Sequence, residues 1–169
     1  MRTPGPRFLP VTVKVAPMLF LLFQLGRDRY ALEAAHVVEI LPLVGVKEIP
    51  RAPSAVVGLF NHRGQPVPLI DLSELMLGRP AKKLLSTRII LVRSGAEGED
   101  RLLGLIAEKA TETLRRDPGD FVPSGVTNDA AAYLGPVAPD PRGFIQWIQV
   151  DQLLPPSLRA MLDSAPVEA

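Results

Sequence analysis

Short apolar runs, separated by Gly, Pro and charged residues, recur along the whole chain. Runs of this kind predict β-strands, because an amphipathic helix needs a longer segment with helical periodicity. We expect strands in the segments 18–25, 29–32, 37–42, 46–49, 56–60, 67–72, 87–92, 102–107, 133–137 and 143–150. We expect short helical segments at 34–36, 73–77, 151–154 and 157–162. The pattern favours an all-β fold with few helical residues.

The clearest hairpin spans residues 56–72, where two apolar runs are joined by a polar turn at 61–65. Gly64 can supply the positive φ that such a turn needs. Pro66 and Pro68 lack backbone N–H donors, so we expect the second run to lie at a sheet edge or beside a bulge. An edge strand next to an exposed arginine is a docking surface, although the same residues also fit an ordinary solvent-facing hairpin.

The composition favours β-barrels over bundles of long helices. Eighteen Pro and 13 Gly among 169 residues leave little room for long helices. The hydrophobic fraction of 47% suffices for two small cores. Because the hairpins at 56–72 and 87–107 are similar, we expect a pair of small barrels.

The charges are balanced and dispersed. Nineteen Lys and Arg oppose 18 Asp and Glu, for a net charge of +1, which argues against nucleic acid or an anionic membrane as the main partner. The chain has no Cys, so disulfides, thiol catalysis and zinc–thiolate sites are excluded. This composition fits a cytoplasmic protein.

The N-terminal region loosely imitates a signal peptide, since Arg2, Arg7 and Lys14 precede the apolar residues 16–23. Several prolines interrupt it, and no small-residue cleavage pattern follows. We therefore interpret residues 1–16 as a flexible extension. No apolar run approaches the length of a membrane span, so we expect no direct membrane insertion.

Candidate catalytic residues are sparse. With His36 and His62 as its two histidines and no Cys, the chain cannot assemble a His/Cys metal cluster, and we expect neither metal nor cofactor. A triad from His62, Asp71 and a serine is conceivable, so a small hydrolase is one alternative. No nucleophile elbow and no phosphate-binding loop accompany it. A β-barrel subunit that only self-assembles is another alternative.

Five segments in order together resemble the CheW-like adaptor family. They are Phe-Leu-Leu-Phe-Gln-Leu-Gly at 20–26, Val-Val-Glu-Ile-Leu at 37–41, Ile-Pro-Arg-Ala-Pro at 49–53, Val-Val-Gly-Leu-Phe-Asn-His-Arg-Gly at 56–64 and Val-Pro-Leu-Ile-Asp-Leu at 67–72. The resemblance implies a CheW-like domain of two barrel lobes over residues 17–156. A C-terminal helix and tail would then occupy 157–169.

The resemblance implies two interlocked five-stranded SH3-like barrels with a hydrophobic groove between them, and no enzymatic activity. Adaptors of this family couple the cytoplasmic tips of methyl-accepting chemoreceptors to a CheA-type histidine kinase in membrane-associated arrays. The pathway implied is swimming chemotaxis or a specialised chemosensory system.

Site residues follow from the same resemblance, position by position. The residues matching the kinase-binding surface are Val37, Glu39 and Gly58. Those matching the receptor-binding surface are Asn61, Arg63, Ile89, Gly104 and Leu105. The five donors of Arg63 could brace the turn or pair with a receptor carboxylate.

Overall fold

The computed structural model describes residues 5, 16–95, 101–154, 156 and 159–160. The predicted extension at 1–16 and the predicted helix at 157–162 therefore lie largely outside the described residues. Within the described part, no helix is long and apolar enough to cross a membrane.

The described residues form nine strands and short helical turns. The strands are β1 (Met18–Leu25), β2 (Asp28–Glu33), β3 (Val37–Leu41), β4 (Val56–His62), β5 (Gln65–Asp71), β6 (Arg88–Ser94), β7 (Arg101–Arg116), β8 (Leu134–Asp140) and β9 (Gly143–Ile148). The helical elements are α1 (Leu72–Leu77) and the 3-10 turns η1 (Ala34–His36), η2 (Pro118–Asp120), η3 (Asp129–Ala131) and η4 (Val150–Gln152). The predicted all-β class is confirmed, and β1 and η1 have their predicted bounds.

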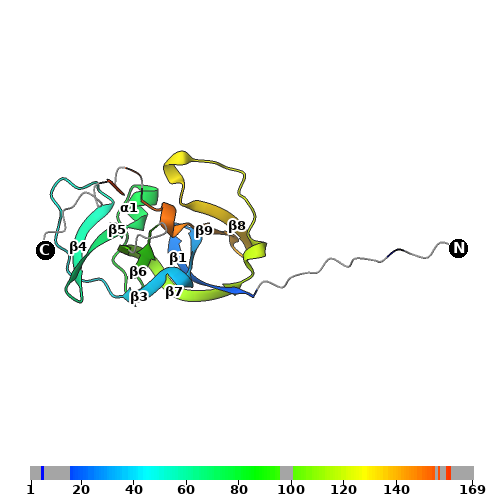
Figure 1. Ribbon diagram of the computed structural model, residues 1–169, viewed down its shortest axis with the longest axis horizontal. Coiled ribbons are helices and arrows are strands. Elements are labelled where there is room, and N and C mark those ends of the chain that lie inside the picture. Colours follow the sequence, from blue (N-terminus) through cyan, green and yellow to red (C-terminus); the bar gives the residue numbers. More distant parts are fainter. Residues whose placement is uncertain (1–4, 6–15, 96–100, 155, 157–158, 161–169) are drawn as a thin grey trace.

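Strand β7 divides the molecule into two lobes (Figure 1). Its first half, residues 101–107, pairs with β6 and β5, and its second half, residues 108–116, pairs with β1. We call β3, β4, β5, β6 and the first half the β4 lobe, and β1, β2, β8, β9 and the second half the β8 lobe. Each lobe has five strands and both share β7, which confirms the predicted pair of interlocked barrels.

Three apolar cores follow from the alternation of side chains along the strands. In β1, Phe20 and Leu22 point into the core of the β8 lobe, whereas Leu21 and Phe23 point into a central core between the lobes. The first strand is therefore buried on both faces. The β4 lobe has its own core, which includes Phe60.

The structure differs most from the predicted strands in two places. Residues 46–49 form no strand, and Lys47 makes only an isolated bridge to Leu59, because Gly45 and Pro50 leave too little chain for a regular ladder. Strand β7 continues to Arg116, well beyond the predicted 102–107. We predicted no strand for its second half, which has several charged residues on its solvent-facing side.

The prolines of β5 have the predicted effect. The N-terminal half of this strand, with Pro66 and Pro68, pairs with β4 alone in the described sheet. Pairing with β7 begins at Leu69, beyond both prolines. A bulge between Val56 and Gly58 interrupts the partner strand β4.

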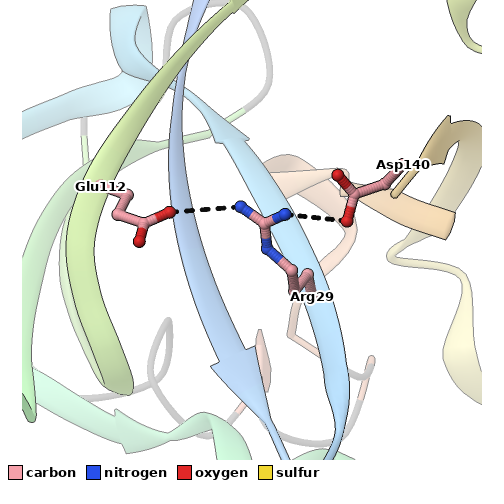
Figure 2. A network of polar contacts seen from close by, with 3 residues as sticks. All are labelled: Arg29, Glu112 and Asp140. Carbon is pink, nitrogen blue, oxygen red and sulfur yellow. Dashed lines mark hydrogen bonds and ion pairs between the residues drawn. The ribbon is translucent and has the colours of Figure 1, made fainter. Parts of the chain in front are cut away.

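An ionic network ties together three strands of the β8 lobe (Figure 2). The Arg29 guanidinium on β2 donates to Asp140 at the end of β8 over 2.8 Å and to Glu112 on β7 over 3.2 Å. Asp140 is nearly buried, with 7% of its side chain exposed, whereas 69% of the Glu112 side chain is exposed. The Asp140 contact should therefore carry most of the stabilisation.

We expect Asp140→Asn to lower the free energy of unfolding by about 1–2 kcal/mol, because it leaves a half-buried guanidinium without its close counter-ion. Glu112→Gln, the matched control at the exposed end, should cost less than about 0.5 kcal/mol. Urea denaturation of both variants measures the difference. Equal losses would show that the two carboxylates contribute alike.

Candidate protein-interaction surface

The turn between β4 and β5 is a two-residue hairpin loop. His62 pairs with Gln65, and the intervening Arg63 and Gly64 both have positive φ, +53° and +85°, as in a type I′ turn. The Asn61 side-chain oxygen accepts a hydrogen bond of 2.7 Å from the Gly64 N–H. The predicted role of Gly64 is confirmed. The turn holds Arg63 outward, with 81% of its side chain exposed.

Glu39 on β3 lies beside this turn. One of its carboxylate oxygens is 3.7 Å from an Arg63 guanidinium nitrogen and 4.0 Å from Nε2 of His62. The His62 ring, only 13% exposed, packs edge-on against Phe60. An exposed pair such as Glu39–Arg63 stabilises by no more than about 1 kcal/mol, so a partner can replace it readily.

Strand β3 is a sheet edge with an apolar outer face. Along one side it pairs with β6, and no described strand pairs with its other side. Val38 and Ile40 are 45% and 43% exposed, whereas Val37 is half-buried against the central core. An edge with unpaired backbone groups and exposed β-branched residues is suited to packing against another barrel.

Gly58 lies beneath this surface, not on it. It is buried, its φ is +152°, and a Cβ at this position would lie 2.2 Å from the carbonyl oxygen of Lys47. The neighbouring Leu59 exchanges two backbone hydrogen bonds of 2.8 Å with Lys47. The close approach that requires glycine is thus made within this chain, and any effect of Gly58 on a partner would act through this packing.

Ile89, Gly104 and Leu105 also lie inside the molecule. Ile89 and Leu105 have no exposed surface, and a Cβ on Gly104 would lie 2.6 Å from the Phe60 ring. Leu105 packs in the central core between the lobes and Ile89 in the core of the β4 lobe, so among the described residues these positions do not line an open groove. The reason is that apolar residues on adjacent paired strands face a core on each side. Their part in receptor binding stays a prediction, through packing alone.

The alternative of a hydrolase with a His62–Asp71 pair is wrong in its geometry. His62 is at the turn of the β4–β5 hairpin and Asp71 is at the other end of β5, about 20 Å along the strand. The nearly buried Asp71 carboxylate accepts hydrogen bonds from the N–H groups of Ser73, Glu74 and Ala81. It is a helix cap.

Two tyrosine hydroxyls of the described chain have a raised pKa. Burial raises the pKa of Tyr30 and of Tyr133, and Asp28 adds to the rise at Tyr30. Both hydroxyls stay neutral at ordinary pH and belong to residues of the central core. No cluster of three His, Asp or Glu side chains that could hold a metal ion occurs among the described residues.

Sequence reasoning missed Val38 and Ile40 as surface residues. The sequence did indicate them: every residue of the strand 37–41 except Glu39 is apolar, so apolar side chains must lie on both of its faces. It also missed the contact between Glu39 and Arg63, which joins the predicted kinase-facing and receptor-facing positions into one surface.

The family model described as CheW-like domain matches residues 19–156. The chain belongs to the CheW-like family. This membership agrees with the two-lobed fold and with the position of the Asn61 to Gly64 turn.

Named relatives of this CheW-like chain include chemotaxis proteins. It is 33% identical to chemotaxis protein CheW of Helicobacter pylori over 62% of this chain and 61% of that protein. It is 27% identical to chemotaxis protein CheW of Treponema pallidum over 87% of this chain and 88% of that protein. Protein FrzA of Myxococcus xanthus is 27% identical over 67% of this chain and 68% of that protein.

A solved structure shows the same fold. Scaffolding protein TtCheW from Thermoanaerobacter tengcongensis superposes with a TM-score of 0.72 at 26% identity, covering 90% of this chain and 94% of that one. The CheW-like chain therefore has the fold of a scaffolding protein.

Proposed function

We propose that this CheW-like protein is a non-enzymatic adaptor that couples chemoreceptor tips to a CheA-type histidine kinase. It would work in the cytoplasm, recruited to membrane receptor arrays, in swimming chemotaxis or a specialised chemosensory pathway. Family membership and the names of the relatives support this proposal. The observation that carries it is the β3 edge, with its exposed apolar face and Glu39 held beside Arg63.

The proposed kinase surface is this β3 edge. Val38 and Ile40 would supply apolar contact area, and Glu39 would supply a charge that selects the partner. Val37 anchors the strand to the central core, and Gly58 allows β4 to lie close beneath the neighbouring segment.

The proposed receptor surface is centred on the turn. Asn61 holds its conformation and Arg63 offers an exposed guanidinium to a receptor carboxylate. Ile89, Gly104 and Leu105 would support it from the core. Since Glu39 contacts Arg63, the two surfaces meet, and binding of one partner can alter the contacts available to the other.

The test is co-sedimentation with a receptor signalling fragment and a CheA-type kinase. We expect Glu39→Lys to weaken kinase binding about tenfold or more, because it reverses a charge at an apolar edge. Arg63→Ala should weaken receptor binding while leaving kinase binding largely intact. Asp129→Lys reverses an exposed acidic residue on the β8 lobe and serves as the matched control.

Circular dichroism of each variant separates misfolding from a binding defect. Unchanged binding by Glu39→Lys and Arg63→Ala would remove the surface assignment but not the family. If the wild type bound neither partner, the adaptor function itself would be wrong. The self-assembly alternative would then be favoured if size-exclusion chromatography showed oligomers.

A further inference from the structure

A second exposed feature lies on the loop that follows α1. We call residues 79–88 the basic loop. Its start is fixed by two carboxylates: Asp71 accepts from the Ala81 N–H over 2.9 Å, and Glu108 accepts from the Lys82 N–H over 2.6 Å. The loop is therefore tied to β5 and β7.

The end of the basic loop is equally well fixed. The Thr87 hydroxyl, in a residue only 1% exposed, accepts from the Leu84 N–H over 3.2 Å and donates to the Lys82 carbonyl. The Arg88 guanidinium donates to the carbonyls of Thr87 and Leu85. These bonds hold the loop in one conformation, so little entropy is lost when a partner binds it.

This fixed loop presents two leucines to solvent. Leu85 is 95% exposed and the adjacent Leu84 is 47% exposed. A single exposed leucine is ordinary on a protein surface. A nearly fully exposed leucine next to a second one, on a loop held from beneath by Thr87, indicates a contact surface.

The leucines have cationic residues on both sides of them in the chain. The basic loop contains four cations and no Asp or Glu, in a chain whose net charge is only +1. Among the described residues, Arg79, Lys82 and Lys83 form no ion pair. An occupant of this surface should therefore carry negative charge beside an apolar stripe.

A cleft of about 770 Å³ adjoins the basic loop, with a lining that is partly apolar and also includes Glu48, Arg51 and Glu74. The loop forms one wall through Ala81 and Lys83, and the segment 43–54 between β3 and β4 forms the other. Leu69 and Ile106 of the β4 lobe contribute apolar surface to its lining. Such a cleft can receive side chains that project from one face of a helix.

The basic loop is remote from the proposed adaptor surface. Asp71, which anchors it, lies about 20 Å along β5 from the turn that carries Arg63. Figure 1 shows α1 and the β4–β5 turn at opposite ends of the β4 lobe. A partner at the basic loop would therefore leave Glu39 and Arg63 free.

We propose that the basic loop docks an acidic amphipathic helix of a partner protein, with Leu84 and Leu85 against its apolar stripe and Lys82 and Lys83 against its carboxylates. A helix fits because Lys83, next to Leu84 in the chain, lines the cleft, so that the leucines and the cleft can take apolar side chains from successive turns. This site is additional to the kinase and receptor surfaces and does not depend on them.

The test uses the full chain and a synthetic fluorescent helix, about five turns long, with a leucine stripe flanked by glutamates. Fluorescence anisotropy should show binding that weakens with added salt. The double variant Leu84→Ser/Leu85→Ser and the double variant Lys82→Glu/Lys83→Glu should each weaken binding about tenfold or more. A helix with lysines in place of the glutamates should not bind.

Matched controls lie on the β8 lobe. Val126→Ser removes another exposed apolar side chain, and Arg142→Glu reverses another exposed cation. Both should bind the acidic helix like the wild type. Because the substituted loop side chains are exposed, the thermal midpoints of the loop variants should match that of the wild type.

Three results would overturn the proposal. The first is that the wild type does not bind the acidic helix. The second is that the loop variants bind it as well as the wild type does. The third is binding to vesicles containing phosphatidylserine but not to the helix, which would assign the basic loop to a lipid surface.

Discussion

Gly58→Ala is expected to lower the free energy of unfolding by about 3–5 kcal/mol. The added Cβ would lie 2.2 Å from the Lys47 carbonyl oxygen and 2.7 Å from a Val46 methyl group, and the φ of +152° is unfavourable for alanine. Since the nearest atom belongs to the backbone, relief requires the bridge between Lys47 and Leu59 to break. Urea denaturation measures the loss.

Gly143→Ala is the matched control for this prediction. Gly143 also has a positive φ, +125°, but nothing lies within 4 Å of a Cβ placed there. Its replacement should cost about 1–2 kcal/mol, from backbone strain alone. A Gly58→Ala variant no less stable than Gly143→Ala would mean that the segment at Lys47 moves aside freely, and that Gly58 is not required for packing.

Asp71→Ala is expected to lower the free energy of unfolding by about 2–4 kcal/mol, since three backbone N–H groups lose their acceptor at once. Two of them begin α1, and the third, from Ala81, fixes the basic loop. Hydrogen exchange should quicken at Ser73, Glu74 and Ala81. The variant should also bind the acidic helix more weakly, because the loop is no longer held.

Asp71→Asn separates the two parts of this effect. The remaining amide oxygen can cap α1, but the amide NH₂ cannot accept from Ala81, so about half of the loss should remain. A variant Asp71→Ala that stays within about 0.5 kcal/mol of the wild type would show that water replaces the carboxylate and that the cap is dispensable.

Local patterns were sufficient to predict much of the fold. A continuous apolar run set the bounds of β1, and Gly64 with the two prolines set the turn and the one-sided pairing of the first half of β5. The second half of β7 escaped prediction, because its pairing with β1 depends on residues far away in the sequence. Periodicity describes one strand at a time and does not identify its neighbours.

The candidate site was less predictable than the fold. Glu39 and Arg63 are brought together by two strands that do not pair with each other in the sheet, so no local spacing signals their contact. The sequence does not show whether apolar residues such as Ile89 and Leu105 are buried in a core or exposed in a groove. The packing of both lobes determines how exposed they are. A resemblance assigns a position but not its exposure.

β7 belongs to both lobes, and this has a mechanical consequence. Each lobe needs part of β7 to complete its sheet, and β7 is one continuous strand. The lobes are therefore joined by a paired strand and not by a flexible linker, so they cannot rotate about a hinge. Two partners bound to different lobes would thereby be kept at constant distance and tilt. A stiff connector of this kind suits assemblies whose members repeat at regular intervals.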